Sequence, residues 1–209
     1  MGRIKYFLVL LLCVLSLSAY KKNEKITIFM IGDSTMANKD ISGGKMERGW
    51  GMMLKNFFTE DVIVDNHALN GRSSKSFISE GHWQKVVEKI KPGDYVFIQF
   101  GHNDEKDDPK RHTDPGTTFD ENLRKFVKET RMRGGIPVLF NSVVRRIFTN
   151  SKTAVADDDT RSNSSADLVE GDTLVDTHGD YLLSPRNVAR ELDVPFVDAL
   201  TSILDPSLP

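Results

Sequence analysis

From Lys25 onward, short apolar runs alternate with longer stretches in which apolar residues recur every three or four positions. The short runs are rich in Val, Ile and Phe, and turn residues bound them. Nearly continuous hydrophobicity over so few residues is typical of parallel strands that are buried on both faces of a sheet. The pattern predicts five strands, at Ile26–Ile31, Val62–Asp65, Tyr95–Phe100, Ile136–Phe140 and Phe196–Asp198.

The stretches between these runs show the apolar spacing of amphipathic helices. The first predicted helix contains Trp50 to Phe58, the second contains Trp83 to Ile90, and the third runs from Phe119 to Met132 until Gly134 and Gly135 end it. A fourth is predicted to begin with Ser184 as its N-cap and Pro185 at its first helical position.

The alternation of strands and helices predicts an α/β fold, a doubly wound, flavodoxin-like three-layer sandwich around a five-stranded parallel sheet. In such a sheet, ligands bind at the carboxyl ends of the strands. The segment from Thr149 to Asp172 is polar and rich in Ser, Asn and Asp, and it predicts a long loop.

The first residues form a different pattern. Arg3 and Lys5 precede an apolar run from Tyr6 to Val14, which small residues follow up to Ala19. We interpret residues 1–18 as a secretory signal peptide whose cleavage would remove Cys13, the only cysteine. An uncleaved membrane anchor is the alternative. Either interpretation places the domain, residues 25–209, outside the cytoplasm, secreted or periplasmic.

Composition narrows the possible partners. The 209 residues contain 28 Lys+Arg and 30 Asp+Glu, and the formal net charge of −2 gives no electrostatic reason to expect nucleic acid or a stable membrane partner after signal cleavage. One cysteine excludes an intrachain disulfide framework and a Cys-rich zinc site. The histidines show no metal-ligand spacing, so we expect neither a metal nor another cofactor.

Three predicted strands end in clusters of glycine and polar residues, which are Gly32 to Met36, Asn70 to Ser73 and Gly101 to Asp104. We expect Gly32 to permit a tight turn into a helix, with Ser34 at the helix N-terminus as a candidate nucleophile. The backbone N–H of Ser34, the backbone N–H of Gly71 and the side-chain amide of Asn103 would then form an oxyanion hole. Taken singly, each cluster is a cap or a turn; the chemical interpretation depends on all three following their strands in order.

The blocks G-D-S-T-M (Gly32 to Met36), N-G-R-S-S-K-S (Asn70 to Ser76) and F-G-H-N-D (Phe100 to Asp104) resemble the SGNH/GDSL hydrolases, specifically the rhamnogalacturonan acetylesterase branch. The resemblance implies the SGNH fold, Ser34 as nucleophile and the three donors above as the oxyanion hole. It also implies that the substrate is an acetyl ester on a pectic polysaccharide of alternating galacturonic acid and rhamnose. Seven cations in or near the strand-end loops are candidate contacts for galacturonate: Lys39, Lys45, Arg48, Arg72, Lys75, Arg145 and Arg146.

The family's base belongs to an Asp-x-x-His block after the fifth strand, at the start of the last helix, and no histidine follows His178 here. The pair Asp176 and His178 has a shorter spacing and precedes the fourth predicted helix. We therefore expect a domain whose C-terminal helix is missing. Two explanations stay open, a truncated chain of an active esterase and a carbohydrate-binding pseudoenzyme. A third class, an acyltransferase or lipase-like relative, also stays open.

Overall fold

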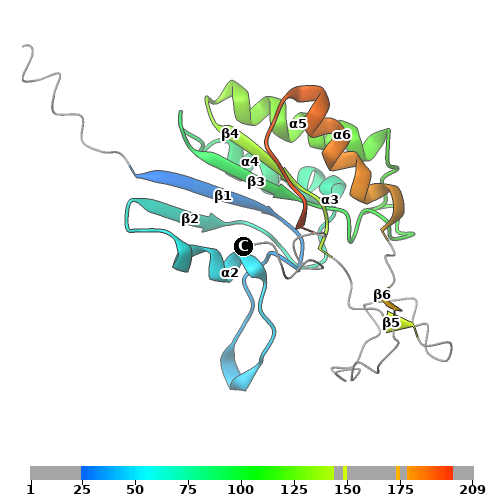
Figure 1. The fold of residues 1–209 in the computed structure, drawn as a ribbon, viewed down its shortest axis with the longest axis horizontal. Helices are drawn as coiled ribbons and strands as arrows, with labels where there is room; N and C mark the ends of the chain where they lie inside the picture. The colour runs from blue at the N-terminus through cyan, green and yellow to red at the C-terminus, as the bar shows by residue number, and fades with distance from the viewer. Residues whose placement is uncertain (1–24, 144–147, 150–172, 175–177, 200–209) are drawn as a thin grey trace, which may run out of the picture.

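The computed structural model describes residues 25–143, 148–149, 173–174 and 178–199. Five parallel strands form one sheet in the order β2-β1-β3-β4-β7, drawn in Figure 1. This confirms the α/β fold and the parallel sheet that the sequence predicts. The strands are β1 (Ile26–Gly32), β2 (Val62–Asn66), β3 (Tyr95–Gln99), β4 (Ile136–Phe140) and β7 (Phe196–Val197).

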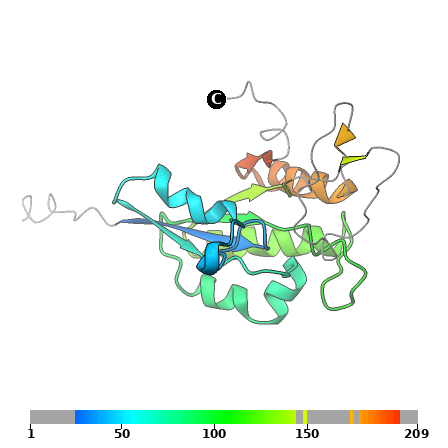
Figure 2. The ribbon, with the colours of Figure 1, turned by 90° about the horizontal axis from the view of Figure 1, so that it is seen from below.

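Helices cover the sheet on both faces, so the domain has three layers (Figures 1 and 2). On one face, alternate strand residues such as Phe29, Ile31 and Ile98 form the larger core with helices α3 to α6. On the other face, the intervening residues form a smaller core with Trp50 and Leu54. The helices are α2 (Trp50–Leu54), α3 (Ser74–Ser79), α4 (His82–Val87), α5 (Thr118–Met132) and α6 (Leu183–Leu192).

The predicted strands agree with the observed ones to within one residue at either end, and α5 begins one residue before its prediction. Three short 3₁₀ helices complete the description: η1 (Ser42–Gly44), η2 (Lys55–Phe57), which continues α2, and η4 (Gly179–Leu182), which leads into α6.

The prediction of Ser184 as an N-cap is wrong. Helix α6 begins at Leu183, directly after η4, so Ser184 lies inside the first turn and is buried. Pro185 is still in the first turn, where its missing N–H leaves no intrahelical hydrogen bond unmade. Helix α3 was not predicted from the apolar spacing, because only six residues form it and three of them are serines.

Outside the main sheet, β5 (Phe148–Thr149) and β6 (Thr173–Leu174) pair antiparallel. Most of the predicted loop between them, residues 150–172, lies outside the described residues, as do the predicted signal peptide, Arg145, Arg146, Asp176 and the place expected for a last helix. None of the helices in the described part of the chain combines the length and apolar character that crossing a lipid bilayer requires.

Candidate active site at the carboxyl ends of the strands

The turn that carries Ser34 follows β1 directly. The backbone N–H groups of Met36 and Ala37 both donate to the carbonyl of Asp33, at 3.2 and 3.0 Å, and close a single turn around Ser34. The expectation of a helix that starts at Ser34 is wrong, because the chain leaves this turn in an extended loop and the next α-helix is α2. Ser34 is therefore held by a local turn and does not stand at the N-terminus of a helix.

Gly32 is required for a reason other than the predicted one. Its φ angle is not positive, so the turn does not need glycine for its backbone conformation. A Cβ atom at Gly32 would lie 2.7 Å from the backbone oxygen of Gln99 and 3.1 Å from the Met36 sulfur. The residue before the turn of Ser34 is thus glycine because β3 and the turn itself approach it closely.

Gly71 fits the predicted role of an accessible backbone donor. Its φ is +70°, in the left-handed region that favours glycine, and no atom lies within 4 Å of a Cβ built there. The chain then enters α3 through Ser73. The Ser73 hydroxyl accepts from the backbone N–H of Ser76, and the Ser76 hydroxyl accepts from the backbone N–H of Ser73. This capping box fixes the direction in which the Gly71 turn leaves β2.

Asn103 is buried, with 4 % of its surface exposed, and its amide orientation is set from both ends. One N–H of its Nδ2 donates to the carbonyl of Arg72 at 3.2 Å, and Nη1 of Arg111 donates to its Oδ1 at 3.5 Å. Since an amide nitrogen carries two hydrogens, one N–H of Asn103 is left for a ligand. This is the donor that an oxyanion would use.

Hydrogen bonds bring the three sequence-predicted clusters together at one edge of the sheet. The N–H of Leu69 donates to the carbonyl of Gly32 at 3.0 Å, which aligns the segment before Gly71 with the turn of Ser34. The bond from Asn103 to Arg72 joins the third cluster to the second. The structure therefore places the turns of Ser34, Gly71 and Asn103 side by side, as the order of the strands requires.

Asp104 connects two of these turns, a role that sequence reasoning missed. Its carboxylate is completely buried and accepts from the backbone N–H of Ser74 at 3.1 Å, from the Ser74 hydroxyl and from the Thr113 hydroxyl at 2.9 Å. Burial raises the pKa of Asp104 to about 6, the donors from Ser74 and Thr113 act in the opposite direction, and the nearby Asp33 raises it further. Its position directly after Asn103 is the only signal in the sequence.

Gln99 was also missed, although it is a polar residue at the end of an apolar strand. Its side chain is 1 % exposed; Oε1 accepts from Nε1 of Trp50 at 2.8 Å, and Nε2 donates to the carbonyl of Asn141 at 3.0 Å. The hydroxyl of Thr35, the neighbour of Ser34, donates to the same Oε1 at 3.2 Å. Asn141 in turn bonds Asp198 and the N–H of Ala199, at the end of β7.

All five histidines of the chain lie in the described residues. The rings of His67, His82 and His112 contact the carboxylates of nearby residues, and Nε2 of His178 lies 2.8 Å from Nδ1 of His102 in a buried pair. Within the described part of the chain, the Ser34 hydroxyl forms no hydrogen bond with any of them. No group of three His, Cys, Asp or Glu side chains is arranged there to hold a metal ion.

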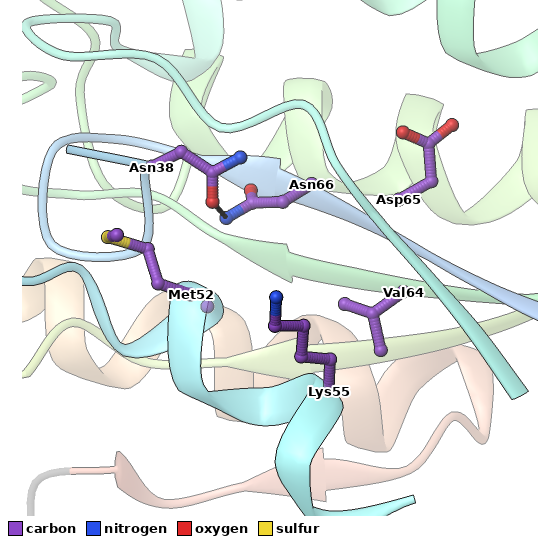
Figure 3. A pocket seen from close by; sticks show the side chains of 7 residues that line it. Asn38, Met52, Lys55, Val64, Asp65 and Asn66 are labelled. Atoms are coloured by element: carbon purple, nitrogen blue, oxygen red, sulfur yellow. Dashed lines mark hydrogen bonds between the residues drawn. The ribbon is translucent and has the colours of Figure 1, made fainter. Parts of the chain in front are cut away.

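A pocket of about 360 Å³ opens beside the edge strand β2 (Figure 3). Asn66 donates to the carbonyl of Met36 at 2.9 Å and to Oδ1 of Asn38 at 3.0 Å, so one wall of the pocket is fixed to the turn of Ser34. None of Ser34, Gly71 or Asn103 lines it. The pocket therefore lies beside the candidate active site and not over it. Its lining residues are Asn38, Gly51, Met52, Lys55, Val64, Asp65 and Asn66.

Comparison with known proteins identifies this arrangement. A profile of the GDSL-like lipase/acylhydrolase family matches residues 30–209, which includes all three clusters. The chain belongs to this family. Within it, sequence similarity places the chain in the rhamnogalacturonan acetylesterase-like branch, which confirms the resemblance seen in the sequence.

Two curated relatives come from Bacillus subtilis (strain 168). The rhamnogalacturonan acetylesterase RhgT is 37 % identical over 177 residues, which are 85 % of this chain and 66 % of RhgT. The probable rhamnogalacturonan acetylesterase YesY is 30 % identical over 178 residues, 85 % of this chain and 71 % of YesY. The chain thus spans about two thirds of the length of these relatives.

The family fold is also found in solved structures. The crystal structure of YxiM from Bacillus subtilis superimposes with a TM-score of 0.61 at 26 % identity. The superposition covers 83 % of this chain and 43 % of the YxiM chain. The sheet and its flanking helices are therefore those of the GDSL-like hydrolases.

Proposed function

We propose that this chain carries the nucleophile and oxyanion hole of an esterase that removes acetyl groups from rhamnogalacturonan. The observation that supports this most directly is the convergence of the Ser34, Gly71 and Asn103 turns, with one N–H of Asn103 left for a ligand. The similarity to RhgT and YesY supports the acetylated pectic substrate. The position of Ser34 at the carboxyl end of β1 supports its role as nucleophile.

In the proposed reaction, the Ser34 hydroxyl attacks the ester carbonyl while a base accepts its proton. The backbone N–H groups of Ser34 and Gly71 and the side chain of Asn103 donate to the oxyanion that forms. Collapse of the tetrahedral intermediate breaks the bond to the sugar oxygen, which receives the proton, and leaves an acetyl group on Ser34. Water then attacks this acetyl group, releases acetate and restores the serine.

None of the five histidines, which all lie in the described residues, forms a hydrogen bond with the Ser34 hydroxyl, so their observed contacts do not identify the base of this reaction. His102 and His178 are paired with each other, and the other three are paired with carboxylates. This observation favours a second candidate function, which is binding of the polysaccharide without turnover. In the esterase, the base is expected from the Asp-x-x-His block of the family.

The decisive experiment measures acetate released from acetylated rhamnogalacturonan. It compares the 209-residue chain, the same chain with Ser34→Ala, and the polypeptide encoded by the complete reading frame with and without Ser34→Ala. The proposed function predicts acetate release that Ser34→Ala abolishes. Binding of the polysaccharide with no acetate release by any form would overturn the esterase and establish the second candidate.

We also propose that the protein acts outside the cytoplasm. The proposal is supported by the charged, apolar and small-residue segments of residues 1–18 and by a polysaccharide substrate too large to diffuse through a membrane. Mass spectrometry of the protein from its host culture tests it. A mature N-terminus near Ala19 in the medium or periplasm is the expected result, and an intact N-terminus in the cytosol would contradict it.

A further inference from the structure

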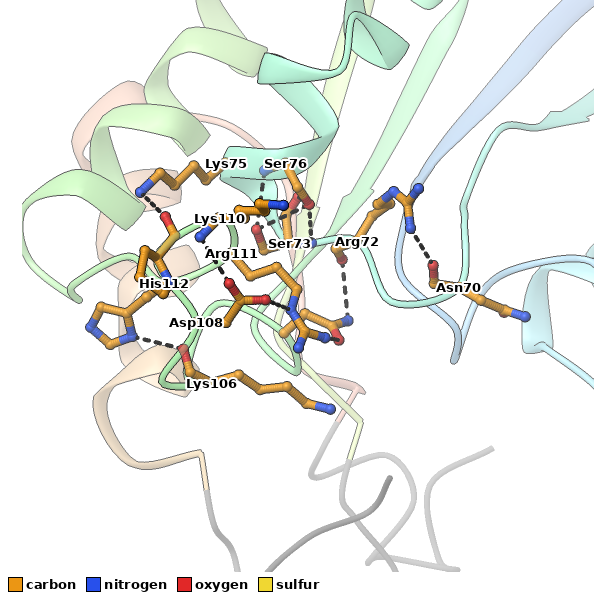
Figure 4. Close-up of polar contacts among 12 residues, drawn as sticks. Asn70, Arg72, Ser73, Lys75, Ser76, Lys106, Asp108, Lys110, Arg111 and His112 are labelled. Carbon is orange, nitrogen blue, oxygen red and sulfur yellow. Dashed lines mark hydrogen bonds and ion pairs between the residues drawn. The ribbon is translucent and has the colours of Figure 1, made fainter. Parts of the chain in front are cut away.

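The candidate cations differ in whether their segments border Asn103. Of the seven candidates that the sequence suggests, Lys39 is paired with Glu47 and Lys45 with Asp40, while Arg48 donates to two backbone carbonyls of its own loop. Arg145 and Arg146 lie outside the described residues. Arg72 is also ion-paired, with Glu80, but its carbonyl contacts Asn103, and Lys75 follows on the same segment; the structure adds two residues from the loop after β3, Lys110 and Arg111 (Figure 4).

Two of these residues are in direct contact with Asn103. The carbonyl of Arg72 accepts from Nδ2 of Asn103, and Nη1 of Arg111 donates to Oδ1 of the same side chain. Glu80 binds Nε of Arg72 at 2.6 Å, and Asp108 binds Nε of Arg111 at 2.7 Å. In each guanidinium the Nη2 group makes no hydrogen bond with a described residue, so it can bind an incoming carboxylate.

The two lysines extend the same surface. Lys75, on α3, donates to the carbonyl of Pro109 at 2.7 Å, and this contact joins the helix to the loop that carries Lys110 and Arg111. No carboxylate of the described residues is paired with Lys75 or with Lys110, and both are exposed. We call the four residues Arg72, Lys75, Lys110 and Arg111 the basic rim.

We propose that the basic rim is a subsite for the carboxylates of an acidic sugar chain bound next to Asn103. Ammonium groups without a carboxylate partner among the described residues, and guanidinium groups whose Nη2 forms no hydrogen bond with them, can both bind a carboxylate. The subsite rests on the proposed function, because it assigns the acetylated ester at Asn103 and the uronates at the rim to one polysaccharide. The basic rim makes the site prefer a polyanionic acetylated substrate over a neutral one.

Calorimetric titration of the whole chain with unesterified trigalacturonate tests the subsite without any catalytic step. We expect Lys110→Gln and Lys75→Gln each to weaken binding about five- to tenfold, and the double variant to weaken it further. The matched control is Lys128→Gln on the exposed face of α5, which removes the same charge outside the basic rim and should leave the dissociation constant unchanged. Circular dichroism melting verifies that all variants are folded.

Three results would overturn the subsite: no binding of trigalacturonate by the unsubstituted chain, unchanged binding by the double variant, or an equal loss in Lys128→Gln. The proposed function is judged separately, by acetate release. If acetate release is absent while the rim variants lose binding, the esterase fails and the subsite stands. In an active form, the ratio of kcat/KM for an acidic acetyl ester to kcat/KM for a neutral one measures the preference for acidic substrates. If the rim variants keep the same ratio as the unsubstituted enzyme, the esterase stands and the subsite fails.

Discussion

The side-chain amide of Gln99 joins the turn of Ser34 to the end of β7 through Asn141. Nε2 of Gln99 donates to the Asn141 carbonyl at 3.0 Å, and the side chain of Asn141 bonds both Asp198 and the N–H of Ala199. On its other side, Oε1 of Gln99 accepts from the indole N–H of Trp50. The backbone N–H of Trp50 donates to the carbonyl of Thr35 at 2.9 Å. Thr35, the residue after Ser34, is therefore linked through Trp50, Gln99 and Asn141 to the carboxyl end of β7.

Replacing Gln99 by Leu should destabilise the domain. The substitution removes the acceptor of the Trp50 indole N–H and the hydrogen bond that Gln99 donates to the Asn141 carbonyl, at a site that is 1 % exposed. A buried polar group left unsatisfied costs about 1–3 kcal/mol, so we expect the free energy of unfolding to fall by at least about 2 kcal/mol. Urea denaturation measures this change.

The matched control is Gln99→Glu, which keeps the acceptor for Trp50. Its second oxygen can donate to Asn141 only when the carboxyl is protonated, so this variant should recover stability as the pH falls. Equal free energies of unfolding for Gln99→Leu and the unsubstituted chain would refute the bridging role of Gln99.

The buried carboxylate of Asp104 should make stability depend on pH. Its pKa is raised from 3.8 to about 6 by burial, so the folded state keeps a proton that the unfolded state releases. The contribution is fully present below about pH 4 and is lost as the pH rises to about 6, with a total loss of up to about 3 kcal/mol.

Chemical denaturation between pH 3.5 and 7.5 tests this dependence by comparison with Asp104→Asn, which has no carboxyl to titrate. The free energy of unfolding of the unsubstituted chain should fall relative to that of Asp104→Asn across pH 4 to 6. Asp107→Asn, on the exposed part of the same loop, serves as the control. Parallel curves for the unsubstituted chain and Asp104→Asn would show that Asp104 does not titrate in this range.

Removing the Asn103 amide should slow acetyl-ester hydrolysis without weakening substrate binding. Its free N–H is proposed to donate to the oxyanion only, so Asn103→Ala in an active form should lower kcat by about 10²–10³ with little change in KM. Asn103→Asp keeps the size of the side chain but replaces the donor by an acceptor, and it should be at least as slow. An active Asn103→Asp enzyme would remove Asn103 from the oxyanion hole.

Strand positions were predictable because burial on both faces leaves a short, continuous apolar run in the sequence. Helix α5 was predictable for a similar reason, since Phe119, Leu123 and Phe126 recur at helical spacing and all three are buried. Helix α3 was not, because its start is fixed by a serine capping box and by the distant Asp104 carboxylate. A contact between residues 30 positions apart leaves no periodic signal.

The candidate site was also predictable from the sequence only in part. The sequence indicated Ser34, Gly71 and Asn103 because each follows its own strand, and in a parallel sheet the carboxyl ends of all strands lie at one edge. It did not predict the single turn at Ser34, the close approach that requires Gly32, or the contacts of Gln99 and Arg111. Each of these depends on which strands are neighbours and on how near their loops approach.

For this protein, the order of apolar runs and strand-end clusters was sufficient for the fold class, the family and the three proposed catalytic groups. The reason is that alternating burial and chain order are local properties that the sequence records directly. Only the tertiary structure decided which contacts hold the site together. Arg111 donates to Asn103, Asp104 accepts from Ser74, and Gln99 links Trp50 to Asn141. Those interactions join residues that are distant in the chain, and their geometry exists only once the sheet has formed.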